Sequence, residues 1–193
     1  MKFRNVPNAL TVFRLVLVPT FLVTTALPGN WSSWVAVYIL ILAGLTDYLD
    51  GALARKLDSL SEFGKMLDPI ADKLMITAVI LVLVWKGNVP LLPALIIIGR
   101  ELVVSGLREY LAVVGKSLEV TLMAKWKTTL QFVALVTLLA ADALNFSNEQ
   151  DFGLGLVGAG LFWLAALVTL ITGCQYWVET RSFMAKRRSK GTS

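Results

Sequence analysis

The sequence lacks histidine entirely, has a single cysteine, and contains few charged residues. Of its 193 residues, 16% are charged and 56% are hydrophobic. A soluble domain carries about a quarter charged residues, so this composition indicates a membrane protein. Without histidine, imidazole zinc sites and Ser-His-Asp triads are excluded, and Cys174 alone cannot form an intramolecular disulfide. Proton transfer at neutral pH must therefore use a carboxylate, Lys, Tyr, Cys or water.

Long apolar stretches dominate the chain, and each can cross a hydrocarbon core that takes about 20 helical residues. The first stretch contains Arg14 and lacks a small-residue cleavage site, so we expect it to be retained. No flexible linker separates the stretches. The sequence therefore predicts an all-α integral membrane protein with one domain, residues 1–193, and six transmembrane helices, at residues 7–27, 31–54, 67–85, 90–113, 124–145 and 153–178.

Basic residues are distributed unevenly between the two ends of these predicted helices. All but one of the 18 Lys and Arg residues lie near the N-terminus, the second and fourth connections or the C-terminus, and only Lys86 lies at the opposite end. The positive-inside rule therefore predicts a multi-pass protein with both termini in the cytoplasm. The basic segment RSFMAKRRSK near the C-terminus could contact anionic headgroups or serve only as a topology signal.

Four aspartates interrupt the second and third apolar stretches. Asp47 and Asp50 are three residues apart in GLTDYLDGALARKL, and Asp68 and Asp72 are four residues apart in GKMLDPIADK. On helices each pair projects from one face, and the two helices are consecutive, so the pairs can converge on the cytoplasmic side. Four unpaired carboxylates in one cleft would repel one another. Two divalent cations such as Mg²⁺ would relieve that repulsion and would suit displacement at phosphorus.

Small residues accompany the aspartates at helical spacing. Gly51 and Ala54 lie on the turn after Asp50, and Gly64 precedes Asp68 by one turn. They would clear space for a flat, bulky group, or they would only allow tight helix packing. Together with Arg55 they complete the pattern D-x-x-D-G-x-x-A-R, eight further residues, then G-x-x-x-D-x-x-x-D. This pattern, filled at all eight positions, resembles the signature of the CDP-alcohol phosphotransferases.

Three further segments extend that resemblance along the chain. NVPNALTVFRLVLVP, IIIGRELVVSGLREYLA and AKWKTTLQ are similar to the bacterial phosphatidylglycerophosphate synthases, a branch of the same family. The resemblance implies a six-helix membrane enzyme, usually a homodimer. It would transfer the phosphatidyl group of CDP-diacylglycerol to glycerol-3-phosphate and release CMP.

The resemblance also implies residue roles. Two divalent cations, Mg²⁺ or Mn²⁺, would bridge the diphosphate, and Asp72 would act as the general base. No role in binding nucleic acid is expected. The metal ligands would be Asp47, Asp50, Asp68 and Asp72, and the CDP-diacylglycerol site would include Gly51, Ala54, Arg55 and Gly64.

Basic and polar residues elsewhere are candidates for binding the remaining substrate groups. Glycerol-3-phosphate is a dianion, so an arginine and lysine cluster should bind it, although the same residues could be only topology signals. Glu101 could pair with Arg100 or Arg108 and orient it. The candidates for the acceptor are Arg100, Arg108, Lys125 and Lys127. Near the N-terminus, the residues that could reach the nucleotide, or simply cap and anchor the first helix, are Asn8, Thr11 and Arg14.

Two alternative functions remain open from the sequence. The acceptor could be another alcohol, such as serine, inositol phosphate or phosphatidylglycerol. The chain could instead be a cation channel or transporter, because carboxylates inside membranes often mark ion pathways. Against transport, the acids cluster at one side, and the midplane of most predicted helices lacks charge.

Overall fold

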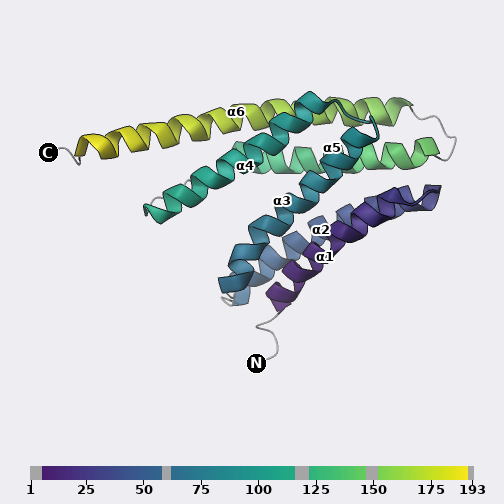
Figure 1. Ribbon diagram of the computed structural model, residues 1–193, viewed down its shortest axis with the longest axis horizontal. Coiled ribbons are helices and arrows are strands. Elements are labelled where there is room, and N and C mark those ends of the chain that lie inside the picture. The colour runs from purple at the N-terminus through teal and green to yellow at the C-terminus, as the bar shows by residue number, and fades with distance from the viewer. Residues whose placement is uncertain (1–5, 58–61, 116–121, 147–151, 191–193) are drawn as a thin grey trace. The chain divides into compact units, whose positions relative to one another are not determined.

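The computed structural model describes residues 6–57, 62–115, 122–146 and 152–190, and these residues form six helices (Figure 1). The helices are α1 (Val6–Ala26), α2 (Asn30–Leu57), α3 (Glu62–Trp85), α4 (Leu91–Val113), α5 (Leu122–Phe146) and α6 (Phe152–Lys190). Within them, the side chains outside the described part are those of residues 6–8, 30, 50–57, 62–66, 68, 122, 124–125, 145–146, 152 and 186–190.

Each predicted apolar stretch overlaps one helix, which confirms the all-helical membrane class. The helix α4 carries Arg100, Glu101, Arg108 and Glu109, and the described side chains of α3 begin only at Leu67. The count of six spans therefore remains a prediction. The described stretches that are long and apolar enough to cross a membrane are Ala9–Ala26, Trp31–Leu49, Trp126–Leu144 and Gly153–Ala185.

The last helix is longer than the sequence indicated. The apolar stretch was expected to end near residue 178, but α6 continues to Lys190 and contains 39 residues. At about 1.5 Å per residue it is about 58 Å long, nearly twice the ~30 Å hydrocarbon core. Hydropathy falls after residue 178, but Glu, Arg, Lys, Met and Ala are good helix formers. The basic C-terminal segment is therefore a continuation of the helix.

The described contacts fall into two units, each of which is described by itself. One unit comprises Met1–Asn88 with Leu135–Gly158, and the other comprises Val89–Ala134 with Ala159–Ser193. In the first unit, α1 packs against both α2 and α3. Its core is apolar and fully buried, with Phe21 from α1, Leu40 from α2 and Leu83 from α3 among the largest buried side chains.

The end of α3 is set by a glycine. Gly87 has φ +77°, a left-handed conformation that glycine adopts without steric cost. The backbone N–H of Asn88 donates to the carbonyl of Leu83 (2.9 Å), and that of Gly87 donates to Val84 (3.0 Å). This pair of hydrogen bonds is the Schellman arrangement that satisfies the last carbonyls of a helix. It also brings Lys86 and Asn88 to the same end of the unit.

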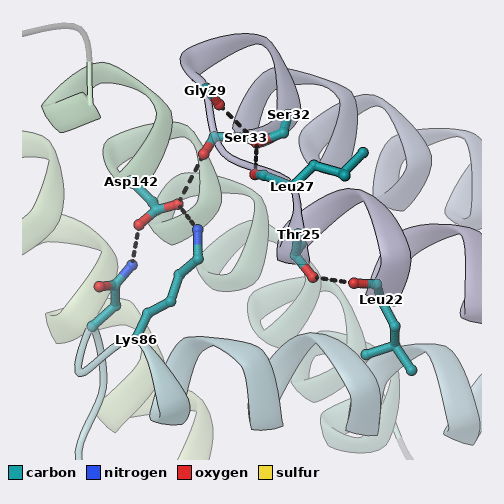
Figure 2. A network of polar contacts seen from close by, with 9 residues as sticks. Leu22, Thr25, Leu27, Gly29, Ser32, Ser33, Lys86 and Asp142 are labelled. Atoms are coloured by element: carbon teal, nitrogen blue, oxygen red, sulfur yellow. Dashed lines mark hydrogen bonds and ion pairs between the residues drawn. The ribbon is translucent and has the colours of Figure 1, made fainter.

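A polar network joins three parts of the first unit around Asp142 of α5 (Figure 2). Lys86 Nζ lies 2.6 Å from Asp142 Oδ2, and Asn88 Nδ2 donates to Oδ1 at 2.9 Å. Ser33 Oγ, near the start of α2, donates to Oδ2 at 3.3 Å. At the connection between α1 and α2, the hydroxyl of Ser32 donates to the carbonyl of Gly29 (2.7 Å). One carboxylate therefore fixes α5 to the start of α2 and to the end of α3.

We expect Asp142→Ala to destabilise the protein, because it removes the acceptor of three donors, one of them charged. The loss should be about 2–3 kcal/mol, which corresponds to a melting temperature about 5–10 °C lower for a chain of this size. In a double-mutant cycle with Lys86→Met, the double variant should lose about 1 kcal/mol less stability than the sum of the two single losses. Strictly additive losses in detergent-solubilised protein would show that the ion pair contributes nothing.

Candidate active site

The eight positions of the acidic pattern lie on two consecutive helices. Asp47 and Asp50 are in α2, and Asp68 and Asp72 are in α3, so both pairs have the predicted helical spacing. Asp47 is partly exposed and Asp72 is exposed. The predicted convergence of all four carboxylates stays a prediction. The pattern members whose side chains lie outside the described residues are Asp50, Gly51, Ala54, Arg55, Gly64 and Asp68.

Asp47 is held by a buried arginine from the first helix. Arg14 Nη1 donates to Asp47 Oδ1 at 2.6 Å, and the Arg14 side chain is 3% exposed. The Asp47 side chain is 46% exposed, so the pair lies at the boundary between the packed helices and an open surface. Thr11, one turn before Arg14, is also buried. Of the three N-terminal candidates, Arg14 thus contacts the acidic pattern, while the Asn8 side chain lies outside the described part.

The Asp47 carboxylate has the chemistry that a hard divalent cation requires. A carboxylate has two oxygens and about four lone-pair sites, so Asp47 can accept from Arg14 and still bind a cation. Mg²⁺ and Mn²⁺ prefer such oxygen ligands and retain water or phosphate ligands as well. Within the part of the chain whose side chains are described, no three acidic, Cys or His residues group together as a metal site. Two of the four predicted ligands, Asp50 and Asp68, lie outside that part.

In the second unit, Arg100 of α4 is surrounded by groups from α6. Its Nη2 donates to Thr172 Oγ1 at 3.2 Å, and its guanidinium carbon lies 5.5 Å from the centre of the Tyr176 ring. That separation is typical of a cation–π contact. Gly173 makes room for the arginine, because a Cβ atom there would lie 2.9 Å from Arg100 Cγ. About three turns further on, Leu111 of α4 packs in the same cluster as Tyr176.

The neighbouring Glu101 pairs with two cations. Its Oε1 lies 3.6 Å from Arg100 Nη1 and also pairs with Lys127 Nζ of α5. The pairing of Glu101 with Arg100 was expected from the sequence, whereas that with Lys127 was not. Lys127 is buried, and Arg108 is exposed. The Lys125 side chain lies outside the described residues, so the structure brings together two of the four predicted acceptor-binding cations.

A polar stripe on α6 was missed in the sequence analysis. Its members are spaced three or four residues apart, so they share one helix face. They interrupt an apolar run only singly, which is why hydropathy did not reveal them, although their helical spacing could have done so. All four are buried, and they are Thr169, Thr172, Tyr176 and Thr180.

The long apolar helices define a polytopic membrane protein. Its first unit carries the acidic pattern on two consecutive helices, and its second unit carries a buried cation cluster. The family model of the CDP-alcohol phosphatidyltransferases matches residues 4–173. The chain belongs to that family, as the acidic pattern indicated.

Curated relatives from several bacteria are similar over most of their length. The protein from Rickettsia bellii is 40% identical over 179 residues, covering 93% of this chain and 97% of that protein. That from Pseudomonas fluorescens is 47% identical over 163 residues, covering 81% and 84%. That from Haemophilus influenzae is 38% identical over 180 residues, covering 91% and 92%. Each is named CDP-diacylglycerol–glycerol-3-phosphate 3-phosphatidyltransferase.

Proposed function

We propose that this chain transfers the phosphatidyl group of CDP-diacylglycerol to glycerol-3-phosphate, giving phosphatidylglycerophosphate and CMP. The complete acidic pattern on α2 and α3, with Asp47 paired to the buried Arg14, carries the proposal. The three named relatives support the choice of acceptor, because each is named for this reaction and matches most of the chain.

Two divalent cations, Mg²⁺ or Mn²⁺, would be held by Asp47, Asp50, Asp68 and Asp72. When bound, they would neutralise the charge of the diphosphate, which is the main requirement of displacement at phosphorus. Arg14 donates a hydrogen bond to Asp47, which would help to orient this carboxylate toward a cation.

Asp72 would accept the proton of the acceptor hydroxyl. A histidine-free site needs a carboxylate, lysine, tyrosine, cysteine or water for this step. Asp72 is exposed on α3, as a base that serves a water-soluble acceptor would need to be. Its second role would be to complete the metal site, which the other three aspartates mainly form.

The cytidine diphosphate would bind along α2 and α3. Gly51, Ala54 and Gly64 would leave space for the base, and Arg55 would contact the nucleotide. Asn8, Thr11 and Arg14 of α1 would bound the same region, which is supported by the contact of Arg14 with Asp47. The acyl chains would remain in the bilayer.

The acceptor phosphate would bind the cations of α4 and α5. Arg100 and Lys127 are buried or nearly so and share Glu101, and Arg108 and Lys125 would add charge near the ends of the same helices. Arginine and lysine donors bind phosphate through charge-assisted hydrogen bonds. The cluster therefore favours a phosphorylated acceptor over serine.

The test of this function is CMP release by the purified chain from CDP-diacylglycerol, with glycerol-3-phosphate, serine, inositol phosphate and phosphatidylglycerol offered in turn. We expect CMP release only with glycerol-3-phosphate, and none when EDTA exceeds the divalent metal. Release with a different acceptor would reassign the substrate, and cation flux without CMP release would favour the transporter alternative.

We further propose a multi-pass protein of the inner membrane with six spans, both termini and the active site in the cytoplasm, and assembly as a homodimer. The unequal distribution of basic residues supports this orientation. The bacterial relatives and the four long apolar helices support the membrane location.

Labelling of single cysteines in a Cys174→Ser background will test the orientation. We expect Pro28→Cys and Ser147→Cys to react with an impermeant thiol reagent from outside intact cells, and Ser59→Cys to react only after permeabilisation. Pro28 is exposed, whereas the nearby Ser32 is buried, so Pro28 is the better reporter. The reverse labelling pattern would place the acidic site on the outer face and contradict the proposal.

A further inference from the structure

Glu101 is the shared partner of two cations in the second unit. Lys127 and Arg100 have side chains that are 5% and 11% exposed, and Glu101 is 24% exposed. One carboxylate thus compensates two cations, which leaves the three groups with a net charge of +1. Two mostly buried cations close together repel each other and are costly to bury unless an anion pairs with them.

The cluster has donors left over. Arg100 uses Nη1 toward Glu101 and Nη2 toward Thr172. Its Nε is buried and has no hydrogen-bond partner among the described residues, and the same holds for Thr169 Oγ1 on the polar stripe of α6. Buried polar atoms normally have partners. An unused N–H on a buried guanidinium therefore points to an additional hydrogen-bond acceptor in the functioning protein, which an anionic oxygen would supply.

We propose that Glu101 is a stand-in for the acceptor phosphate. Without acceptor, its carboxylate occupies Lys127 and Arg100 and keeps both cations in place. When the acceptor binds, its phosphate takes over these donors, and the carboxylate and phosphate compete for them. Glu101 is a positioning residue, because it acts through the two cations and not on the reacting atoms.

This inference rests on the proposed function, in which Arg100 and Lys127 bind the acceptor phosphate. If Glu101 competes with phosphate, its removal should raise the affinity for phosphate, whereas removal of a purely structural ion pair should not. Removing the negative charge should strengthen the binding of an anion, because repulsion between like charges a few ångströms apart is strong at a mostly buried site. The same change should weaken the fold, because the two cations then lose the carboxylate that they share.

The test compares Glu101→Gln with Glu109→Gln in the full-length purified protein, with inorganic phosphate as the probe. Glu109 is an exposed acid on the same helix, so its replacement removes the same charge away from the cluster. We expect Glu101→Gln to be inhibited by inorganic phosphate at about a tenfold lower concentration and to have a KM for glycerol-3-phosphate about tenfold lower. Its melting temperature should fall by several degrees, and Glu109→Gln should change none of these.

A second variant covers the case in which Glu101→Gln does not fold. Glu101→Asp keeps the charge but is one methylene shorter, so it cannot reach both cations equally well, and we expect it to show a two- to fivefold gain in phosphate affinity. A lower melting temperature with unchanged or weaker phosphate inhibition in both variants would overturn the proposal and leave a structural ion pair.

Lys127→Met separates this inference from the proposed function. If Lys127→Met weakens phosphate inhibition but neither Glu101 variant strengthens it, the stand-in role is wrong and the acceptor site stands. If Lys127→Met leaves phosphate inhibition unchanged, the acceptor site itself is wrong, and the stand-in role with it.

Discussion

Asp47→Asn is expected to reduce the rate of CMP release at least about a hundredfold while the protein remains folded. A hundredfold loss corresponds to about 2.7 kcal/mol of transition-state stabilisation, which is in the range expected when a metal or electrostatic contribution is lost. The substitution keeps the size of the side chain and a neutral oxygen for Arg14, so most of the ion-pair geometry can persist. Asp50→Asn and Asp68→Asn should lose activity to a similar degree.

Two measurements separate loss of a metal ligand from loss of the Arg14 contact. In Asp47→Asn, the Mg²⁺ or Mn²⁺ concentration that gives half-maximal activity should rise, and excess metal should restore part of the rate. The melting temperature should change by no more than a few degrees. Asp58→Asn is the matched control, because Asp58 follows α2 directly but lies outside the acidic pattern. Activity that persists in all three pattern variants, or in excess EDTA, would contradict the two-metal site.

The helices could be predicted from the sequence because their apolar stretches are long and are interrupted by turn residues. The end of α3 is an example, since Gly87, which has a positive φ, follows the apolar stretch directly and ends the helix. The end of α6 could not be found in the same way. Residues after 178 lose hydropathy but keep helix propensity, and hydropathy alone does not distinguish the end of a membrane span from the end of a helix.

The candidate site was predictable where a residue type is chemically unusual for its surroundings. Carboxylates in apolar helices and Arg14 within an apolar stretch were identified in this way, and Arg14 does contact Asp47. The partners that come from distant helices were not predictable. Lys127 pairs with Glu101 across 26 positions, and Asp142 gathers Ser33, Lys86 and Asn88. Such pairings depend on which helices are neighbours, and the spacing of residues in one sequence does not encode that.

Lys127 is expected to contribute more than Arg108 to binding the acceptor phosphate. Lys127 is buried and ion-paired, whereas Arg108 is exposed, so the two should not contribute equally to phosphate binding. We expect Lys127→Met to raise the KM for glycerol-3-phosphate about ten- to a hundredfold, because one charge-assisted hydrogen bond is worth ~1.5–3 kcal/mol. Arg108→Met should raise it less, because solvent weakens interactions of exposed charges.

The increase in KM should be confined to glycerol-3-phosphate. The KM for CDP-diacylglycerol should stay nearly constant in Lys127→Met, because its diphosphate is assigned to the aspartates of α2 and α3. Lys127→Arg should recover part of the loss through its charge, though not all, because a planar guanidinium does not reproduce the geometry of an ammonium group. Arg181→Met is the matched control, since Arg181 is an exposed cation of α6 in the same unit. An unchanged KM for glycerol-3-phosphate in well-folded Lys127→Met and Arg100→Met would reduce the cluster to a topology signal, and the acceptor would then rest on similarity to the relatives alone.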